Sequence, residues 1–289
     1  MTARPTREGR DAARLRPLTE ADLPTAQALT AALRWPHRVE DWAFCLTLGE
    51  GLAAELDGRL VGTTLGWCYG PDAAALGLVV VADAAQGRGI GRALTEGVMR
   101  LLGERSITLC ATAAGAPLYS SLGFAGAGTV HQHQGSSFSA ELVALPPGQR
   151  LRPLGRSDAR VLAALDTQAT GMRRDALIEA LLPLSDGVVL DRDGEAIGFA
   201  LIRRFGHGQV IGPVMAPDVT GARAMIAHWL GSRSGQFIRI DVPDGCGLSP
   251  WLEALGLTEV GGGEVMVRGT PPRGNGAVSC FALVSQALG

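Results

Sequence analysis

The fold is decided by the stretch Val79-Val80-Val81-Ala82-Asp83-Ala84-Ala85-Gln86-Gly87-Arg88-Gly89-Ile90-Gly91-Arg92-Ala93-Leu94. A β-branched apolar run ends there in a short polar turn, and apolar residues at helical spacing follow at once, which predicts a strand, a loop and a helix. Glycines at positions 87, 89 and 91 remove every second Cβ, so successive backbone N–H groups can converge at the start of the helix. Because the first amides of a helix bind anions well, the stretch predicts a phosphate site.

Two common phosphate loops do not match this stretch. A P-loop needs Gly-Lys-Ser/Thr after its first glycine and four further residues, and the chain contains no lysine. The dinucleotide fingerprint G-x-G-x-x-G needs a glycine at position 92, where the chain has Arg92. From the residues alone, the alternative to a phosphate site is a tight strand-to-helix turn whose glycines serve packing.

The pattern Gln86-x-x-Gly89-x-Gly91 after an apolar strand resembles the pyrophosphate loop of the GNAT superfamily of acetyl-CoA-dependent N-acyltransferases. The resemblance implies acetyl-CoA (coenzyme A) as the cofactor, a bulge in the strand before the loop, and further contacts along that strand and at the end of the next one. The cofactor-binding residues that it implies are Val79, Val80, Val81, Gln86, Gly87, Arg88, Gly89, Ile90, Gly91, Arg92, Thr112 and Tyr119.

Tyr119 stands in a second pattern of the family, Tyr119-x-x-x-Gly123-Phe124. The resemblance implies that Tyr119 lies near the CoA sulfur and acts as the general acid. The alternative is a half-buried tyrosine in the core of an amphipathic helix. A free phenol is a weaker acid than a free thiol, so full proton transfer to the leaving thiolate is uphill by roughly 2 kcal/mol. We therefore expect Tyr119 to act as much by hydrogen bonding as by giving up its proton.

Length and composition limit the class of protein. The chain has 289 residues, enough for two domains with separate cores. Hydrophobic residues make up 46% and charged residues 19%, the net charge is −2, and no apolar run approaches the roughly 20 residues of a membrane span. We expect a soluble protein with no membrane or nucleic-acid partner. The five cysteines are odd in number and include no C-x-x-C pair, which favours the cytoplasm and argues against a disulfide framework or a metal site.

The sequence repeats one plan twice. Leu15-Arg16-Pro17-Leu18 recurs as Leu151-Arg152-Pro153-Leu154, and the hairpin signal Asp57-Gly58 recurs at the same spacing as Asp193-Gly194. The copies meet near Pro146-Pro147-Gly148. We predict a disordered lead-in over residues 1–13, a catalytic domain over 14–146 (the first half) and a related domain over 149–289 (the second half).

The predicted fold class is α/β, layered as in α+β proteins: two tandem GNAT-like domains, each a mixed, mostly antiparallel, twisted sheet flanked by helices. In the first half we expect strands 14–18, 51–57, 60–69, 75–82, 106–112, 127–134 and 139–145, with helices 20–33, 38–48, 88–103 and 115–122. In the second half we expect strands 150–154, 187–192, 195–204, 208–215, 237–242, 259–268 and 277–285, with helices 157–170, 174–183, 219–231 and 248–255.

The second half has lost the features that imply chemistry in the first. The glycine-rich loop shrinks to Val219-Thr220-Gly221-Ala222, and Tyr119 aligns with Leu252. We therefore expect a degenerate GNAT domain with a structural role. This predicts a monomer with an internal pseudo-dimer, or a homodimer.

The acceptor side is less clearly marked. Many relatives place a glutamate on the strand before the loop as general base, and this strand has none. The candidates for the base are His37, Glu40 and Asp41, in the segment that joins the first two helices. The expected substrate-binding residues are Trp35, His37, Asp41, Trp42, Trp67, Tyr69 and His131. The alternative is a solvated helix start with both tryptophans of that segment in the core.

These features predict an N-acyltransferase that moves an acetyl group from acetyl-CoA to a primary amine of a small molecule or peptide. Transfer is expected to be direct within a ternary complex, because no Cys-His or Ser-His pairing suggests a covalent intermediate. The alternative function is a CoA-binding or ligand-sensing module without turnover.

Overall fold

The computed structural model describes residues 13–136, 140 and 142–289. It contains two compact units. Unit 1 consists of the described residues up to Trp67 together with Leu76–Gly103, and unit 2 consists of Cys68–Ala75 and Glu104–Gly289. Of the predicted lead-in, residues 1–12 lie outside the described part, and Ala13 packs against an apolar cluster of unit 1.

Unit 1 is a small antiparallel sheet with helices. Its elements in chain order are β1 (Arg14–Pro17), α1 (Leu23–Ala32), α2 (Val39–Thr47), β2 (Glu50–Leu56), most of β3 (Arg59–Tyr69), the second part of β4 (Ala73–Val81) and α3 (Ile90–Leu102). β2 pairs with β1 on one side and with β3 on the other. The predicted hairpin is present: Asp57 and Gly58 have φ angles of 51° and 73°, and a two-residue turn of this kind fits the twist of the paired strands.

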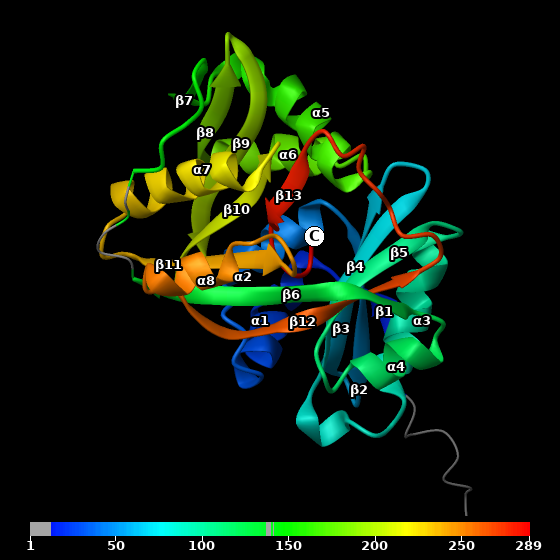
Figure 1. Ribbon diagram of the computed structural model, residues 1–289. Helices are drawn as coiled ribbons and strands as arrows, with labels where there is room; N and C mark the ends of the chain where they lie inside the picture. The colour runs from blue at the N-terminus through cyan, green and yellow to red at the C-terminus, as the bar shows by residue number, and fades with distance from the viewer. Residues whose placement is uncertain (1–12, 137–139, 141) are drawn as a thin grey trace, which may run out of the picture. The chain divides into compact units, whose positions relative to one another are not determined.

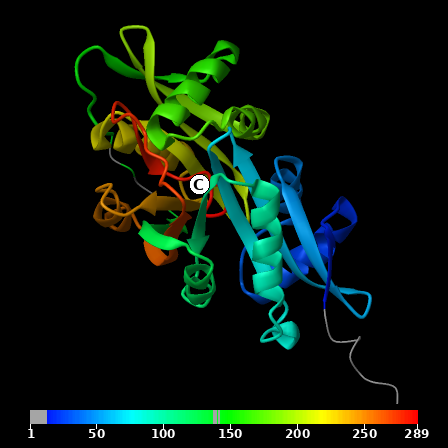
Figure 2. The same ribbon diagram turned by 90° about the vertical axis from the view of Figure 1, so that its right-hand side faces the viewer.

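Helix α3 lies against the sheet of unit 1 (Figure 2). Ile90 and Leu94 are buried in one cluster with Ala54. A Cβ on Gly66 of β3 would lie 3.0 Å from side-chain atoms of Val98 and Leu102, so glycine allows helix and strand to approach closely. The apolar face of α3 thus fixes where the helix begins, directly after the glycine-rich loop.

Unit 2 contains the rest of the chain (Figure 1). Its elements after the first part of β4 are β5 (Ser106–Ala111), α4 (Ala116–Ser121), β6 (Ala125–Ser136), β7 (Gln149–Pro153), α5 (Ala159–Thr170), α6 (Asp175–Leu181), β8 (Ser185–Arg192), β9 (Glu195–Phe205), β10 (Gly208–Ala216), α7 (Val219–Ser232), β11 (Phe237–Pro243), α8 (Ser249–Ala254), β12 (Thr258–Arg268) and β13 (Ser279–Ala282). The strand order is β5-β12-β6-β11-β10-β9-β8-β7, and β13 pairs with β10.

The two halves of the sequence exchange strands in unit 2. β12 comes from the second half and lies between β5 and β6 of the first half. β6 in turn pairs with β11 of the second half (Figure 1). Each half therefore completes the other's sheet, which is why the compact units differ from the two halves of the sequence.

The core of the second half surrounds α7. Ala200 and Ile202 of β9 pack in one buried cluster with Met225 and Trp229 of α7. The indole N–H of Trp229 donates to the Ala200 carbonyl at 3.4 Å. Since side chains alternate along a strand, the intervening Leu201 points to the other face of the sheet, which α5 covers.

Apart from the strand over 139–145, the predicted order of strands and helices is confirmed in both halves. The predicted strand 277–285 is shorter and covers only Ser279–Ala282. Of the predicted strand 139–145, residues 139 and 141 lie outside the described part, and residues 140 and 142–145 form no strand. In the described part of the chain, no helix is long and apolar enough to cross a membrane.

The repeated Leu-Arg-Pro-Leu motif encodes an ion pair in each half. Arg16 donates from Nη1 and Nη2 to the Asp22 carboxylate at 2.8 and 2.7 Å. Arg152 donates to Asp158 at 2.7 and 2.8 Å. Each aspartate also accepts a backbone N–H three residues earlier, at 2.9 and 2.6 Å. The motif thus joins the first strand of each half to the helical segment after it.

Asp22→Asn is expected to destabilise unit 1. The hydrogen bonds from Arg16 lower the pKa of Asp22 to about 2, so the ionised form stabilises the fold above pH ~4, and this stabilisation is lost as the pH falls toward 2. We expect a loss of about 1–2 kcal/mol at pH 7, measured by urea unfolding. The difference from the wild type should shrink at pH 3.

Asp57→Asn is the control, because Asp57 is an exposed turn residue of the same unit. It should change the free energy of unfolding by less than about 0.5 kcal/mol. A destabilisation by Asp22→Asn that is the same at pH 7 and pH 3 would contradict the assigned role of the ion pair.

Candidate functional site

The loop between β4 and α3 has the geometry of an anion site. Gly87 and Gly89 have φ angles of 73° and 76°, in the left-handed region that favours glycine, and Gly89 is the N-cap of α3. A Cβ at either position would meet no atom of the described residues within 4 Å, so none of these residues fills the space beside the loop. The amide of Ala93 donates to the Gly89 carbonyl at 3.0 Å, so the amides of residues 90–92 come before the helical hydrogen-bond ladder.

Side chains hold the ends of this loop. The Gln86 amide donates from Nε2 to the Val81 carbonyl at 3.2 Å and to Asp83 Oδ1 at 3.0 Å. Ile90 is only 5% exposed and fixes the first turn of α3 in the core. Arg88 is exposed, and Arg92 forms an exposed ion pair with Glu96 at 3.3 Å. The loop is anchored at both ends while its glycines face open space.

Strand β4 is irregular just before the loop. Leu78 has a φ of 52°, which is uncommon for leucine, and its carbonyl accepts the Thr63 hydroxyl at 3.1 Å. Parallel pairing between β4 and β5 covers only residues 73–75 of β4. Val80 is buried, whereas Val79 and Val81 are half-buried. Leu78 thus interrupts the regular strand conformation directly before Val79, and the bulge that the resemblance implies at residues 79–81 stays a prediction.

The corresponding region of the second half is filled by the chain itself. β10 pairs in parallel with β11 only at Gln209 and Val210. Beyond this point, residues 214–216 of β10 pair with β13, and the next residue, Leu283, donates its N–H to the Asp241 carbonyl of β11 at 2.9 Å. β13 thus takes the place beside β10 that a bound ligand would need.

Helix α7, the counterpart of α3, begins with a side-chain cap. Its N-cap is Asp218, whose Oδ1 accepts the N–H of Gly221 at 2.8 Å. The Asp218 carboxylate thus accepts a hydrogen bond from one amide in the first turn of α7, whereas α3 has no side-chain cap. The negative charge of this carboxylate would repel a phosphate. The two helices therefore differ in the property that anion binding requires.

Tyr119 lies in α4 of unit 2 and is 8% exposed. Its ring packs edge-on against Phe124, with the ring centres 6.0 Å apart. Burial, together with the nearby Cys110 thiol, raises the pKa of Tyr119 to about 12. The phenol therefore keeps its proton at neutral pH. Thr112 lies shortly before the same helix, and its carbonyl accepts the N–H of Ala116, the first residue of α4, at 3.0 Å.

The three base candidates are at the start of α2 in unit 1. Asp41 is buried and accepts Arg38 Nη2 at 2.7 Å and Arg38 Nε at 3.0 Å, so its carboxylate stabilises the helix start. Glu40 is exposed in the same turn, and His37 is half-buried with its ring 6.1 Å from that of Trp35. The role of general base stays a prediction for these residues.

Two of the expected substrate-binding tryptophans are in the core of unit 1. Trp42 is fully buried, and its indole N–H donates to the Thr30 hydroxyl at 3.3 Å. Trp67 is 1% exposed and donates to the Cys45 carbonyl at 2.8 Å. Trp35 is half-buried. Trp42 and Trp67 therefore belong to the buried core of unit 1.

The other two expected acceptor residues are in unit 2. His131 lies 2.8 Å from Glu259 and 3.5 Å from Asp244, and the hydrogen bond with Glu259 raises the pKa of this imidazole. Tyr69 is buried, and its hydroxyl donates to the Leu288 carbonyl at 2.8 Å. The sequence reasoning did not anticipate what surrounds Tyr69.

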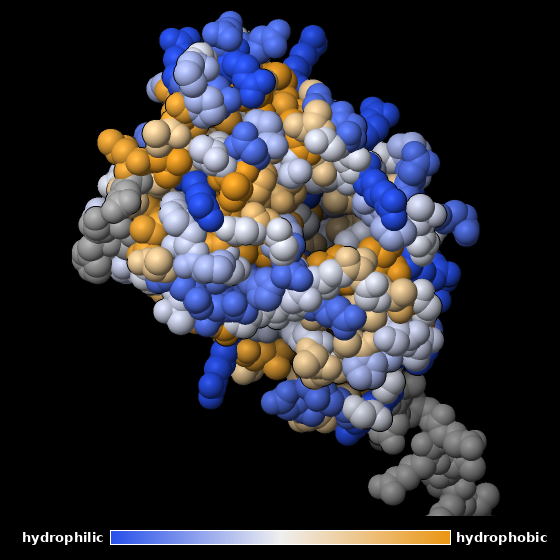
Figure 3. Space-filling model, in the orientation of Figure 1, coloured by the Kyte–Doolittle hydropathy of each residue, from blue (hydrophilic) through white to orange (hydrophobic). Residues whose placement is uncertain are grey.

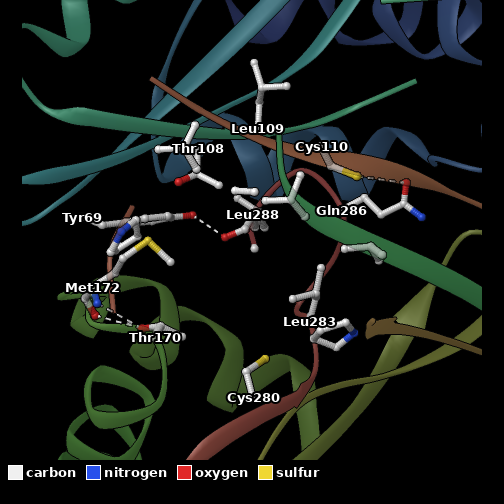
Figure 4. Close-up of a pocket in the computed structure, with 18 of the residues that line it drawn as sticks. Tyr69, Thr108, Leu109, Cys110, Thr170, Met172, Cys280, Leu283, Gln286 and Leu288 are labelled. Carbon is white, nitrogen blue, oxygen red and sulfur yellow. Dashed lines mark hydrogen bonds between the residues drawn. The ribbon is translucent and has the colours of Figure 1, made fainter. Parts of the chain in front are cut away.

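Tyr69 lines a cavity of about 260 Å³ within unit 2. Figure 4 shows Thr108, Leu109 and Cys110 of β5 along one side and Cys280 and Leu283 of the second half on the opposite side. The molecular face around the C-terminal residues is hollowed and bordered by hydrophobic side chains (Figure 3). No local motif marks this cavity in the sequence, because its wall comes from distant segments that only the exchange of strands brings together.

Comparisons with known proteins identify the family. The acetyltransferase (GNAT) domain family matches residues 48–125 and residues 162–278, one match in each half. The uncharacterized N-acetyltransferase YitH of Bacillus subtilis is 31% identical over 219 residues, which are 74% of this chain and 76% of that protein.

Solved structures share the fold. A putative acetyltransferase from Pyrococcus horikoshii has a TM-score of 0.78 at 18% identity, with 96% of each chain covered. A tandem GNAT protein from the clavulanic acid biosynthesis pathway has a TM-score of 0.63 at 14% identity, covering 88% of this chain and 98% of that one. The predicted fold class is confirmed, and the family favours an enzyme over a sensing module. The chain therefore belongs to the GNAT family and is a tandem GNAT acetyltransferase.

Proposed function

We propose that this acetyltransferase binds acetyl-CoA with the α3 loop of the first half and transfers its acetyl group directly to a primary amine of a small molecule or peptide. The observation that carries the proposal is the contrast between two helix starts. α3 begins after glycines with open space beside them, whereas α7 begins with the carboxylate of Asp218.

The α3 loop fits a diphosphate. Open space at Gly87 and Gly89 lets an anion approach the backbone, and the first amides of α3 precede the helical hydrogen-bond ladder and have no side-chain cap. Each hydrogen bond to a charged group contributes ~1.5–3 kcal/mol. Arg88 adds positive charge at the exposed rim. We assign the pantetheine arm to the half-buried edge of β4 at Val79 and Val81.

Acetyl-CoA, when bound, supplies the acetyl group as a thioester: its C–S bond breaks as the C–N bond to the acceptor forms, and the proton lost by the amine balances the one gained by the thiol. For Tyr119 we propose a hydrogen-bond donor at the leaving sulfur. A phenol with a pKa of about 12 would protonate a free thiolate uphill by about 5 kcal/mol, so donation to developing charge is favoured over full transfer.

Direct transfer is supported by the thiols near the cavity. Burial raises the pKa of Cys110 and of Cys280 to about 12, so both are protonated at neutral pH. Because the thiolate is the nucleophile, neither cysteine suits a covalent acyl intermediate. We further propose that the chain acts in the cytoplasm, as a monomer with an internal pseudo-dimer or as a homodimer.

Acetyl-CoA is expected to raise the melting temperature of the wild type, because it binds the folded state. At a concentration of about 100 times Kd it adds ~2.7 kcal/mol, or about 5–10 °C. Gly89→Glu should abolish the shift by placing a carboxylate where the diphosphate binds. Differential scanning fluorimetry gives both values.

Gly194→Glu is the matched control for this experiment. Gly194 has a φ of 94° and, like Gly89, no atom within 4 Å of a Cβ, so the backbone strain is similar. It lies in a hairpin turn of the second half and should leave the shift intact. Equal melting curves of the wild type with and without acetyl-CoA would count against the proposed function.

Tyr119→Phe is expected to lower kcat by about 10²-fold or more while keeping the acetyl-CoA shift, because it removes a donor used in the transition state. The raised pKa of Tyr119 means that the donor is present at every pH below about 12. The wild-type rate should therefore not fall between pH 7 and pH 10 through ionisation of Tyr119. Thiol release with a panel of amines measures both effects, and an unchanged kcat in Tyr119→Phe would refute the assigned role.

A further inference from the structure

We propose that the cavity of unit 2 binds the apolar body of the acceptor, so that the preferred substrates are small hydrophobic amines. This inference rests on the proposed function and adds the chemical class of the acceptor. The cavity is lined by residues of both halves, including Leu109 and Val130 of the first and Val265, Val267 and Leu283 of the second.

The size of the cavity suits a ring with a short chain. An apolar cavity of about 150 Å³ holds a benzene ring, and this cavity measures about 260 Å³. Most of its lining is aliphatic, with Met172, Pro271 and Pro272 beside the branched side chains. The protonated thiols of Cys110 and Cys280 add to this apolar surface.

The one side-chain charge at the cavity wall, among the described residues, is neutralised within the protein. Among the described residues that line it, the one charged side chain is Arg174. Arg174 is fully buried and forms two hydrogen bonds with Asp166, at 2.9 and 2.6 Å, and a third with the Leu288 carbonyl at 3.2 Å. The wall therefore presents no side-chain carboxylate to a polycation, and it disfavours acceptors such as diamines.

Two polar groups remain for a ligand. Within the described residues, the hydroxyl oxygen of Thr108 is buried and has no hydrogen-bond partner. Gln286 donates its Nε2 to Asp241 at 3.0 Å, which leaves Oε1 with only a weak contact to the Cys110 thiol at 3.9 Å. A ligand with one neutral polar group, such as an uncharged amine, matches this pair.

Position links the cavity to the chemistry. Cys110 of β5 lines the cavity, and β5 leads directly into α4, which carries Tyr119 and is tied to the strand end by the hydrogen bond from the Ala116 N–H to the Thr112 carbonyl at 3.0 Å. An amine held among apolar side chains is desolvated, which disfavours its ammonium form. The cavity would thus supply a neutral nucleophile without a glutamate on β4, the residue that the sequence lacks.

The first test measures binding without turnover. The probe is 2-phenylethanol, an uncharged compound that resembles 2-phenylethylamine and has no amine to acetylate. Titration calorimetry should detect binding to the wild type and at least tenfold weaker binding to Ala287→Phe, because the new ring enters the cavity. Ala287 is half-buried and lines the cavity, and Ala196→Phe changes an equally half-buried alanine outside it. This control should bind the probe like the wild type.

The second test needs only the wild type and covers the case in which Ala287→Phe does not fold. Across n-alkylamines from propyl to hexyl, KM should fall about fourfold per methylene, the equivalent of ~0.8 kcal/mol of burial. 1,4-Diaminobutane should be a poor acceptor. A KM independent of chain length, or equal binding of 2-phenylethanol to the wild type and Ala287→Phe, would overturn the proposal.

The two proposals fail in different ways. If acetyl-CoA stabilises the wild type but 2-phenylethanol does not bind, the acceptor cavity is wrong and the proposed function stands. If acetyl-CoA gives no stabilisation, the proposed function is wrong and the acceptor assignment falls with it, whatever 2-phenylethanol does.

Discussion

The account depends on the left-handed turn through Gly87 and Gly89 that ends β4 and begins α3. The first amides of a helix lie before its hydrogen-bond ladder, and glycine at the helix start puts no Cβ in the way of an anion that approaches them. The energetic cost of such an open helix start is offset by the apolar side chains of α3 that pack on the sheet of unit 1. α7 begins instead with the Asp218 carboxylate, which accepts the N–H of Gly221 and places a negative charge at the helix start.

The second half shares the fold of the first half but differs from it in the contacts beside β10 and at the start of α7. Its core around α7 is as fully buried as a functional domain requires, but β13 pairs with β10 where the corresponding strands of the first half part. Its strand β12 is hydrogen-bonded between β5 and β6 of the first half. The second half is therefore an integral part of unit 2, because its strands belong to the sheet that carries Cys110 and lines the cavity.

Local sequence patterns predicted most of the fold and the loop. The alternation of glycines at 87, 89 and 91, the hairpin at Asp57-Gly58 and the repeated Leu-Arg-Pro-Leu motif all act within a few residues. The remaining features are long-range. The exchange of β12 and β6 leaves every local pattern unchanged. The left-handed φ of Leu78 is uncommon for leucine, so the residue type does not predict it. The cavity joins Tyr69 to Leu288, residues that are far apart in the sequence. In the sequence, a buried tryptophan such as Trp67 looks the same as a ligand-binding one, because only its burial in the folded protein separates the two roles.

Amide hydrogen exchange with and without acetyl-CoA tests the central claim most directly, because it reports on the backbone donors themselves. The account predicts slower exchange at residues 87–92 when acetyl-CoA is added and no change at residues 219–222. Protection confined to the start of α7, with unchanged exchange in the glycine-rich loop, would contradict it.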